Sequence, residues 1–238
     1  MTNPFGATQQ RAGYVSDADA ARVSAFIRGV YWWMALGLGV TAVVALVVSS
    51  SPAAVSTLVR TPILFFGIII AELVLVVYLS ARVATMASST AGTLFLAYSA
   101  LNGVTFSLIL LAYTGASVAN AFVVAAGTFG ALAVYGSVTK RDLTGMGRFM
   151  FMGLIGLVIA SVVSIFWHND AMQFVMGVIG VLVFSGLIAY DTQRLRSMAL
   201  QLQGGETGAH AVVGALSLYL NFINLFISLL RIFGRRDS

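Results

Sequence analysis

The chain has 238 residues, of which 59% are hydrophobic and only 9% are charged, and its mean hydropathy is +0.96. About a quarter of the residues of a soluble domain are charged, so this chain has too few ionic side chains to cover a surface that faces water. It contains no cysteine and two histidines, which excludes disulfides, thiolate nucleophiles and Cys-ligated metal centres. We therefore expect an all-α membrane protein without a cofactor.

Seven stretches are long and apolar enough to cross a bilayer, because a hydrocarbon core of about 30 Å requires about 20 helical residues. None of them alternates in polarity as a strand of a membrane barrel does. They predict seven transmembrane helices between a polar N-terminal tail (1–28) and a short basic tail (235–238), within a domain at 29–234. The predicted spans are 29–49, 62–81, 91–112, 118–138, 148–167, 172–192 and 212–232.

The net charge of +5 would suggest nucleic acid for a soluble protein, but in a membrane protein it indicates cationic cytosolic loops and no nucleic-acid partner. With a cytosolic N-terminus, Arg60 is the single cation in the loops of the opposite side. The cytosolic side then holds nine: Arg11, Arg22, Arg28, Arg82, Lys140, Arg141, Arg148, Arg194 and Arg196. The sequence therefore predicts a multi-pass protein of the bacterial inner membrane with its N-terminus in the cytosol.

The C-terminal cations conflict with this orientation. An odd number of spans would place Arg231, Arg235 and Arg236 outside the cytosol. Either this cluster is a tolerated exception to the positive-inside rule, or the last helix does not cross fully.

Loop lengths indicate how the helices are grouped. The connections at 113–117 and 168–171 are short, so the third and fourth helices, and the fifth and sixth, are expected to be antiparallel neighbours. The connection at 193–211 is long, which allows the seventh helix to pack away from the sixth. These lengths favour two groups of three helices and a separately placed seventh.

Two acidic residues lie inside the predicted spans, Glu72 and Asp191. An unpaired charge near a helix centre costs about 2.5–3.5 kcal/mol, so each should face protein or water. Glu72, midway along its helix, could either hold a neighbouring helix by hydrogen bonds or take part in transport. Asp191, near the predicted cytosolic end, could simply pair with Arg194 at i+3, or it could be functional.

A polar stripe runs along the seventh helix. Its residues are spaced four, three and four apart, which confines them to an arc of roughly 60°. Such a stripe must face other helices or a wet cavity, and it could serve either as interhelical hydrogen bonding or as the lining of an ion path. The stripe comprises Ser217, Asn221, Asn224 and Ser228, and a smaller polar group on the third helix comprises Tyr98, Ser99, Asn102 and Thr105.

Enzyme signatures are not supported by the residues in the spans. An intramembrane aspartyl protease needs two carboxylates at one site, and the predicted spans contain no second aspartate. Ser185 lacks the G-x-S-x-G frame of a serine hydrolase, and His168 and His210 lie at span edges. We therefore expect no catalytic residues.

Four strings together resemble the bacterial branch of the Bax inhibitor-1 (TMBIM) family, from about residue 20 to the end. They are AELVLVVYLSAR (71–82), TKRDLTGMGRFMFMGLIGL (139–157), GLIAYDTQRL (186–195) and GALSLYLNFINLFISLLRIFG (214–234). The resemblance implies a central seventh helix wrapped by two three-helix layers. It also implies a pH-sensitive calcium leak channel, in which two aspartates of the sixth and seventh helices share a proton and gate the cytosolic side.

Carried over to this chain, the resemblance makes Asp191 the aspartate of the sixth helix and Glu72 the acid of the second. It makes Arg82 the arginine that latches the closed state. The second aspartate falls on Asn221, and an Asp–Asn pair loses the like-charge repulsion of two carboxylates. We therefore expect a weaker pH response, or one displaced to lower pH.

The contact between this pair conflicts with the predicted spans. Asn221 lies about nine residues into its helix, roughly 13 Å at the usual rise, whereas Asp191 lies almost at the end of the predicted sixth helix. A contact requires the sixth helix to extend further or the seventh to begin later.

The sequence thus predicts a pH-modulated calcium leak channel or ion-permeation protein, with calcium or protons as the permeant ion. Its site is Asp191, Asn221 and Arg82, with Asp191 as a candidate calcium ligand. The ion path could include Glu72, Asn102, Ser217, Asn224 and Ser228. The alternative is a regulatory protein whose N-terminal tail contacts a membrane-anchored AAA protease.

Overall fold

The computed structural model describes residues 17–167, 169–202 and 207–235. His168, Arg236 and the first sixteen residues of the predicted tail lie outside this described part. The helices are α1 (Asp17–Ser49), α2 (Pro52–Arg60), α3 (Pro62–Arg82), a 3-10 turn η1 (Val83–Thr85), α4 (Ser88–Ala112), α5 (Gly115–Val138), α6 (Thr144–Phe166), α7 (Asp170–Gln201) and α8 (Thr207–Phe233).

Among the described helices, seven are long and apolar enough to cross a membrane, which confirms the predicted all-α polytopic class. Two boundaries differ most from the prediction: α1 begins at Asp17 rather than near residue 29, and α7 continues to Gln201 rather than ending near residue 192. The apolar run that predicted this span ends where the polar residues of α7 begin. The helix continues because Leu195 and Ala199 remain buried in the core.

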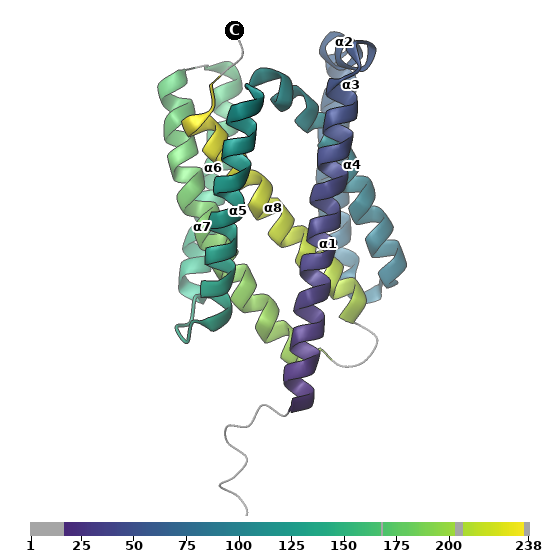
Figure 1. Ribbon diagram of the computed structural model, residues 1–238, viewed down its shortest axis with the longest axis vertical. Helices are drawn as coiled ribbons and strands as arrows, with labels where there is room; N and C mark the ends of the chain where they lie inside the picture. The colour runs from purple at the N-terminus through teal and green to yellow at the C-terminus, as the bar shows by residue number, and fades with distance from the viewer. Residues whose placement is uncertain (1–16, 168, 203–206, 236–238) are drawn as a thin grey trace, which may run out of the picture.

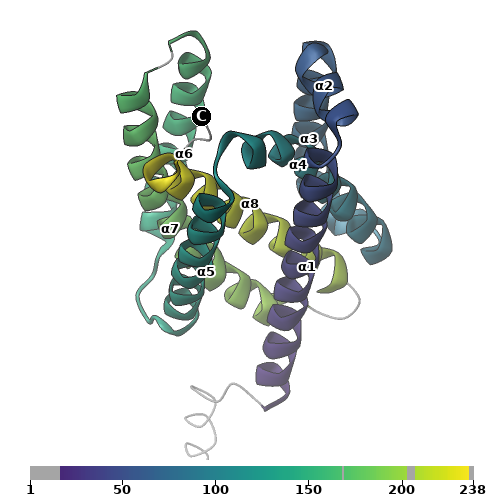
Figure 2. The same cartoon turned by 45° about the horizontal axis from the view of Figure 1, so that its top comes forward.

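The long helices form two layers with α8 between them (Figure 1). One layer contains α1, α3 and α4, and the other contains α5, α6 and α7. The turned view shows the same division, with α8 crossing obliquely between the layers (Figure 2). This arrangement confirms the predicted central helix wrapped by two three-helix layers.

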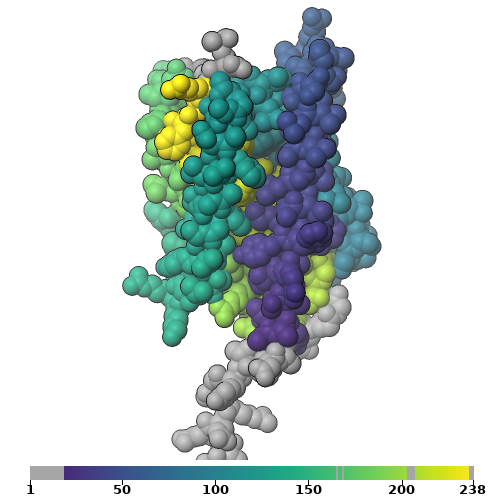
Figure 3. All heavy atoms as spheres, in the orientation of Figure 1, coloured from purple at the N-terminus to yellow at the C-terminus, as the bar shows by residue number. Residues whose placement is uncertain are grey.

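Burial identifies α8 as the core of the bundle. In its most apolar window 72% of the residues are buried, against 6% for α3. In the space-filling view most of α8 is covered by the surrounding helices on the face shown (Figure 3). Enclosure gives its polar side chains, such as Ser217, Tyr219 and Asn221, hydrogen-bond partners that lipid cannot supply.

Small residues let α7 approach α8 and α5 closely. A Cβ added to Gly180 would collide with the Ser228 side chain of α8, and one added to Gly136 of α5 would collide with the carbonyl of Ala189. In a bilayer, where apolar burial alone does not favour helix association, close backbone approach increases the packing attraction.

The prediction that the third and fourth helices are neighbours was wrong. Within the described ranges α5 packs along α7 and α8 and does not pack along α4. The C-terminal end of α8 separates the two helices: the Thr114 amide donates to the Arg235 carbonyl at 3.1 Å, and the Arg235 amide donates to Ser117 Oγ at 2.9 Å. The short connection therefore crosses over α8 and joins the two layers.

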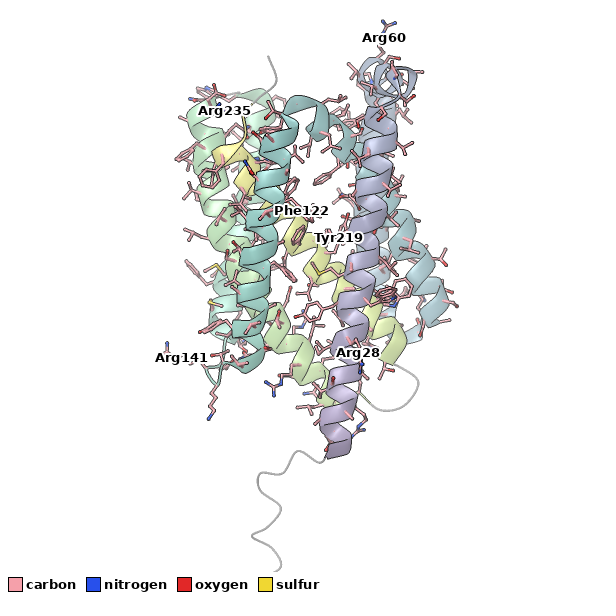
Figure 4. The ribbon with its side chains drawn as sticks, viewed as in Figure 1. Arg28, Arg60, Phe122, Arg141, Tyr219 and Arg235 are labelled. Carbon is pink, nitrogen blue, oxygen red and sulfur yellow. The ribbon has the colours of Figure 1, made fainter. Side chains whose placement is uncertain are left out.

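The structure also decides between the two interpretations of the C-terminal cations. Arg235 lies at the same end of the bundle as Arg60, whereas Arg28 and Arg141 lie at the opposite end (Figure 4). The last helix therefore runs the length of the bundle, so with the predicted cytosolic N-terminus Arg231 and Arg235 depart from the positive-inside rule.

Candidate functional site

Asp191 of α7 is buried and bound to α8 by two hydrogen bonds. Ser217 Oγ donates to Asp191 Oδ2 at 2.7 Å, and Asn221 Nδ2 donates to the same oxygen at 2.8 Å. The structure thus brings together the aspartate and the asparagine that the family resemblance pairs. The conflict with the predicted spans disappears because α7 extends ten residues beyond Asp191.

Arg194 is the cation that accompanies Asp191. Its guanidinium lies 4.0 Å from Asp191 Oδ1, with 57% of the arginine side chain exposed. An exposed ion pair at the limit of contact contributes only about 0–1 kcal/mol, whereas hydrogen bonds to a charged group contribute about 1.5–3 kcal/mol each. The two bonds to α8 therefore position Asp191, and the expected i+3 ion pair adds little.

The residues after Asp191 contact two other parts of the bundle. Thr192 lies against Tyr31 of α1. Gln193 accepts a 2.9 Å hydrogen bond from the Leu143 amide and donates a 2.8 Å bond to the Arg141 carbonyl. Since successive helical residues are about 100° apart, the D-T-Q string faces α8, α1 and the α5–α6 loop in turn.

A cavity of about 310 Å³ lies beside Asp191. Its walls come from the end of α3, the C-terminal part of α7 and the N-terminal part of α8, and they include Ser80, Arg194, His210 and Ser217. These segments lie toward the end of the bundle that carries Arg28 and Arg141 (Figure 4), which is the predicted cytosolic end. The cavity thus places a mostly apolar void, with a few polar groups in its walls, beside Asp191 on the side where the resemblance implies a gate.

Arg82 is not part of this arrangement. It is exposed at the end of α3, and in the described part of the chain no ion pair joins it to Asp191. Ser80 and Val83, on either side of it, line the cavity instead. The proposed latch therefore stays a prediction.

The second intramembrane acid, Glu72 of α3, is bound by side chains of α4, in the layer that does not contain Asp191. Asn102 Nδ2 donates to Glu72 Oε2 at 3.3 Å, and Thr105 Oγ1 donates to Oε1 at 3.1 Å. Asn102 Oδ1 in turn accepts a 3.0 Å hydrogen bond from the Tyr219 hydroxyl, which lies 2.6 Å from Thr41 Oγ1. This network joins α3, α4, α8 and α1, and we call it the Glu72 network.

Sequence reasoning missed Tyr219 and Thr41. Tyr219 is fully buried, and its ring makes edge contacts with Phe95 and Tyr98. In a span, a tyrosine among leucines and phenylalanines resembles a packing residue. Its position could have been a signal, because Tyr219 lies about 200° around α8 from Ser217 and therefore on the opposite face.

The two halves of the polar stripe of α8 differ in their hydrogen-bond partners. Ser217 and Asn221 contact Asp191, whereas Asn224 Nδ2 donates to the Leu220 carbonyl and Ser228 Oγ donates to the Asn224 carbonyl, at 2.8 and 2.7 Å. The second half is therefore satisfied by the backbone of its own helix. This favours the packing interpretation for Asn224 and Ser228.

Asp191 as a calcium ligand stays a prediction. In the described ranges no group of three or more His, Cys, Asp or Glu side chains could hold a metal ion. Calcium usually takes six to eight oxygen ligands. At Asp191 the protein offers one carboxylate, a hydroxyl and an amide, which is fewer groups than this number of ligands.

Comparison with known proteins identifies the family. A family model described as "Inhibitor of apoptosis-promoting Bax1" matches residues 23–238. The chain belongs to the Bax inhibitor-1 family. The matched region includes the whole site, from Glu72 on α3 to Asn221 on α8.

Relatives within the Bax inhibitor-1 family cover nearly the same length. The chain is 46% identical over 219 residues to an inner membrane protein of Escherichia coli, YbhL. This alignment covers 91% of this chain and 94% of YbhL. An uncharacterized protein of Deinococcus radiodurans is 43% identical over 217 residues, covering 91% of this chain and 93% of its own length. An uncharacterized protein of Caulobacter vibrioides is 45% identical over 221 residues, covering 88% of each chain. Together with the seven spans, the similarity to YbhL makes this a multi-pass protein of the inner membrane.

Proposed function

We propose that this protein is a pH-modulated calcium leak channel, or more broadly an ion-permeation protein, gated where α7 meets α8. The observation that carries the proposal is Asp191, a carboxylate buried inside the bundle, bound to the central helix and bordered by a cavity. Intramembrane acids are rare because they are energetically unfavourable, and they commonly mark ion pathways.

Protonation of Asp191 would weaken the contact between α7 and α8. Both hydrogen bonds end on one oxygen, Oδ2, and a charge-assisted hydrogen bond is about twice as strong as a neutral one. A proton on the carboxyl group therefore reduces both bonds at once without breaking them. Lower pH should then favour separation of the helices and increase flux.

Oxygen atoms are present on both sides of α8 for a permeating cation. Asp191, Ser217 and Asn221 lie on one side, and Glu72 with Thr105 lies on the other. Calcium favours hard oxygen ligands of this kind.

The test is calcium flux into proteoliposomes containing the purified protein, measured across pH for the wild type and Asp191→Asn. We expect flux that rises as pH falls in the wild type, and a flattened pH profile in the variant. Asp142→Asn is the matched control: Asp142 lies in the α5–α6 loop, its carboxylate accepts a hydrogen bond from the Thr144 amide, and its substitution should leave the profile unchanged. An identical profile for the wild type and Asp191→Asn would refute the proposal.

A further inference from the structure

A second and larger hollow lies between the two layers and is lined by Thr192, which faces a different side of α7 from Asp191. It has a volume of about 710 Å³ and is bounded by α1, α5 and α7. We call it the α1/α5 groove. Its lining includes Tyr31 of α1, and Phe129, Gly130 and Ala133 of α5.

The α1/α5 groove exists because its two side walls belong to different layers. Within the described ranges α1 and α5 do not pack along each other. They meet at the edge contact between the rings of Tyr31 and Phe129, whose centroids are 6.4 Å apart. The space-filling view shows the separation of α5 from α1 on this face (Figure 3).

The groove runs from the predicted membrane-spanning part of the bundle toward its cytosolic end, since Ala20 and Ser24 of its α1 wall precede the predicted first span (29–49). All three of its walls are membrane-spanning helices, and Val134, on its α5 wall, is 62% exposed. An apolar hollow in this position is not stably filled by water, which would lack hydrogen-bond partners there. A hydrocarbon chain is the occupant whose chemistry matches it.

One end of the groove is cationic. A neighbouring pocket of about 390 Å³ shares Ser137, Arg196 and Leu200 with the groove. This pocket is also lined by Lys140 and Arg141, at the predicted cytosolic end of the bundle (Figure 4). The Arg196 guanidinium donates to the Ser137 carbonyl, which holds it at the boundary between the apolar and the cationic parts.

The charge of this end favours an anion. Asp142 is the one acid among the pocket's lining residues, against Lys140, Arg141 and Arg196. The Asp142 carboxylate accepts hydrogen bonds from Thr144, and these bonds hold its pKa below the usual value, so it is ionised at neutral pH. The three cations still leave a net positive charge for a ligand.

We propose that the α1/α5 groove and the cationic pocket together bind one anionic phospholipid of the cytosolic leaflet. An acyl chain lies along Phe129 and Ala133, and the phosphate lies against Arg196, Lys140 and Arg141. Basic pockets between spanning helices on the cytosolic side are a general means of binding anionic headgroups. The groove supplies the chain site, and the pocket supplies the selectivity for charge.

The experiment measures the fraction of immobilised lipid label by electron paramagnetic resonance. Full-length protein is reconstituted in phosphatidylcholine vesicles that contain a trace of spin-labelled phosphatidylglycerol or spin-labelled phosphatidylcholine. We expect preferential immobilisation of phosphatidylglycerol, decreasing as salt is raised. Equal immobilisation of the two labels would overturn the proposal.

Two pairs of variants test the chain site and the charge site separately. Gly130→Trp should fill the groove and abolish the preference, whereas Gly156→Trp on α6 should retain it, since an added Cβ meets nothing within 4 Å at either position. The double variant Lys140→Gln with Arg141→Gln should lower the relative affinity for phosphatidylglycerol by about fivefold per cation removed. Arg60→Gln, at the opposite end, should have no effect.

Other occupants give distinguishable results. If phosphatidylglycerol selectivity appears only after residues 1–16 are deleted, the tail fills the groove and the proposal is wrong. If Gly130→Trp changes the oligomeric state and leaves the lipid preference intact, the groove is a contact between copies of the chain, and the proposal is equally wrong.

Discussion

Asn221 Nδ2 donates a 2.8 Å hydrogen bond to Asp191 Oδ2, so an amide lies where the family resemblance implies a second carboxylate. Asn221→Asp should therefore restore a pair that shares a proton. Two carboxylates that share a proton interact by more than about one pK unit, so the midpoint of the flux response should move to higher pH by about one unit or more. Calcium flux in proteoliposomes measures this. An unchanged midpoint in Asn221→Asp would contradict the argument.

Tyr219→Phe should destabilise the bundle through the Glu72 network. The substitution keeps the ring contacts but removes the hydroxyl that bonds Asn102 and Thr41, both of which are buried. Interhelical hydrogen bonds in membranes contribute roughly 0.6–1.7 kcal/mol, so the loss should be on the order of 1 kcal/mol. Thermal unfolding in detergent measures it, with the 45% exposed Tyr135 changed to phenylalanine as the control. Equal stability of the two variants would show that the Tyr219 hydroxyl contributes nothing to the stability of the bundle.

Gln193→Ala should loosen the loop between α5 and α6. It removes both hydrogen bonds to this loop and leaves the amide of the buried Leu143 without its acceptor. An unsatisfied buried donor costs about 1–3 kcal/mol. Hydrogen exchange should increase at 139–143, and Gln201→Ala, at the exposed end of α7, should leave it unchanged. Protection that survives Gln193→Ala would mean that other contacts order the loop.

The two ends of the chain should lie on opposite sides of the membrane. A reporter active only in the cytosol should work when fused to the N-terminus and fail when fused after residue 238. The reason is that α8 runs the length of the bundle, and Arg235, which lies beside Ser117, is at the end opposite Arg28. A cytosolic signal from both fusions would contradict the full crossing of α8.

The regulatory alternative can be separated from permeation. Deleting residues 1–16 should leave calcium flux intact, because α1 begins at Asp17 and the deleted segment precedes it. Any effect on a membrane-anchored AAA protease should be lost in this variant. Asp191→Ala should show the reverse pattern, with altered flux and normal regulation. Loss of flux on deleting the tail would contradict this division of roles.

Local features of the sequence determined the spans and the candidate acids. Hydropathy identifies a spanning helix from about 20 consecutive residues, and two acids are conspicuous inside such segments whatever the fold. Helical periodicity likewise placed Ser217 and Asn221 on one face of α8. Both signals depend only on neighbours in the chain, and the structure agrees with them.

Only the tertiary structure decided which faces meet. A short connection predicts that α4 and α5 are neighbours, but α8 separates them because its polar side chains take hydrogen-bond partners from both layers. The length of α7, set by the burial of Leu195 and Ala199, brings Asp191 to Asn221. Tyr219 became visible as a polar centre only when Asn102 and Thr41, distant in sequence, were placed around its hydroxyl. These contacts depend on long-range packing, which no local pattern encodes.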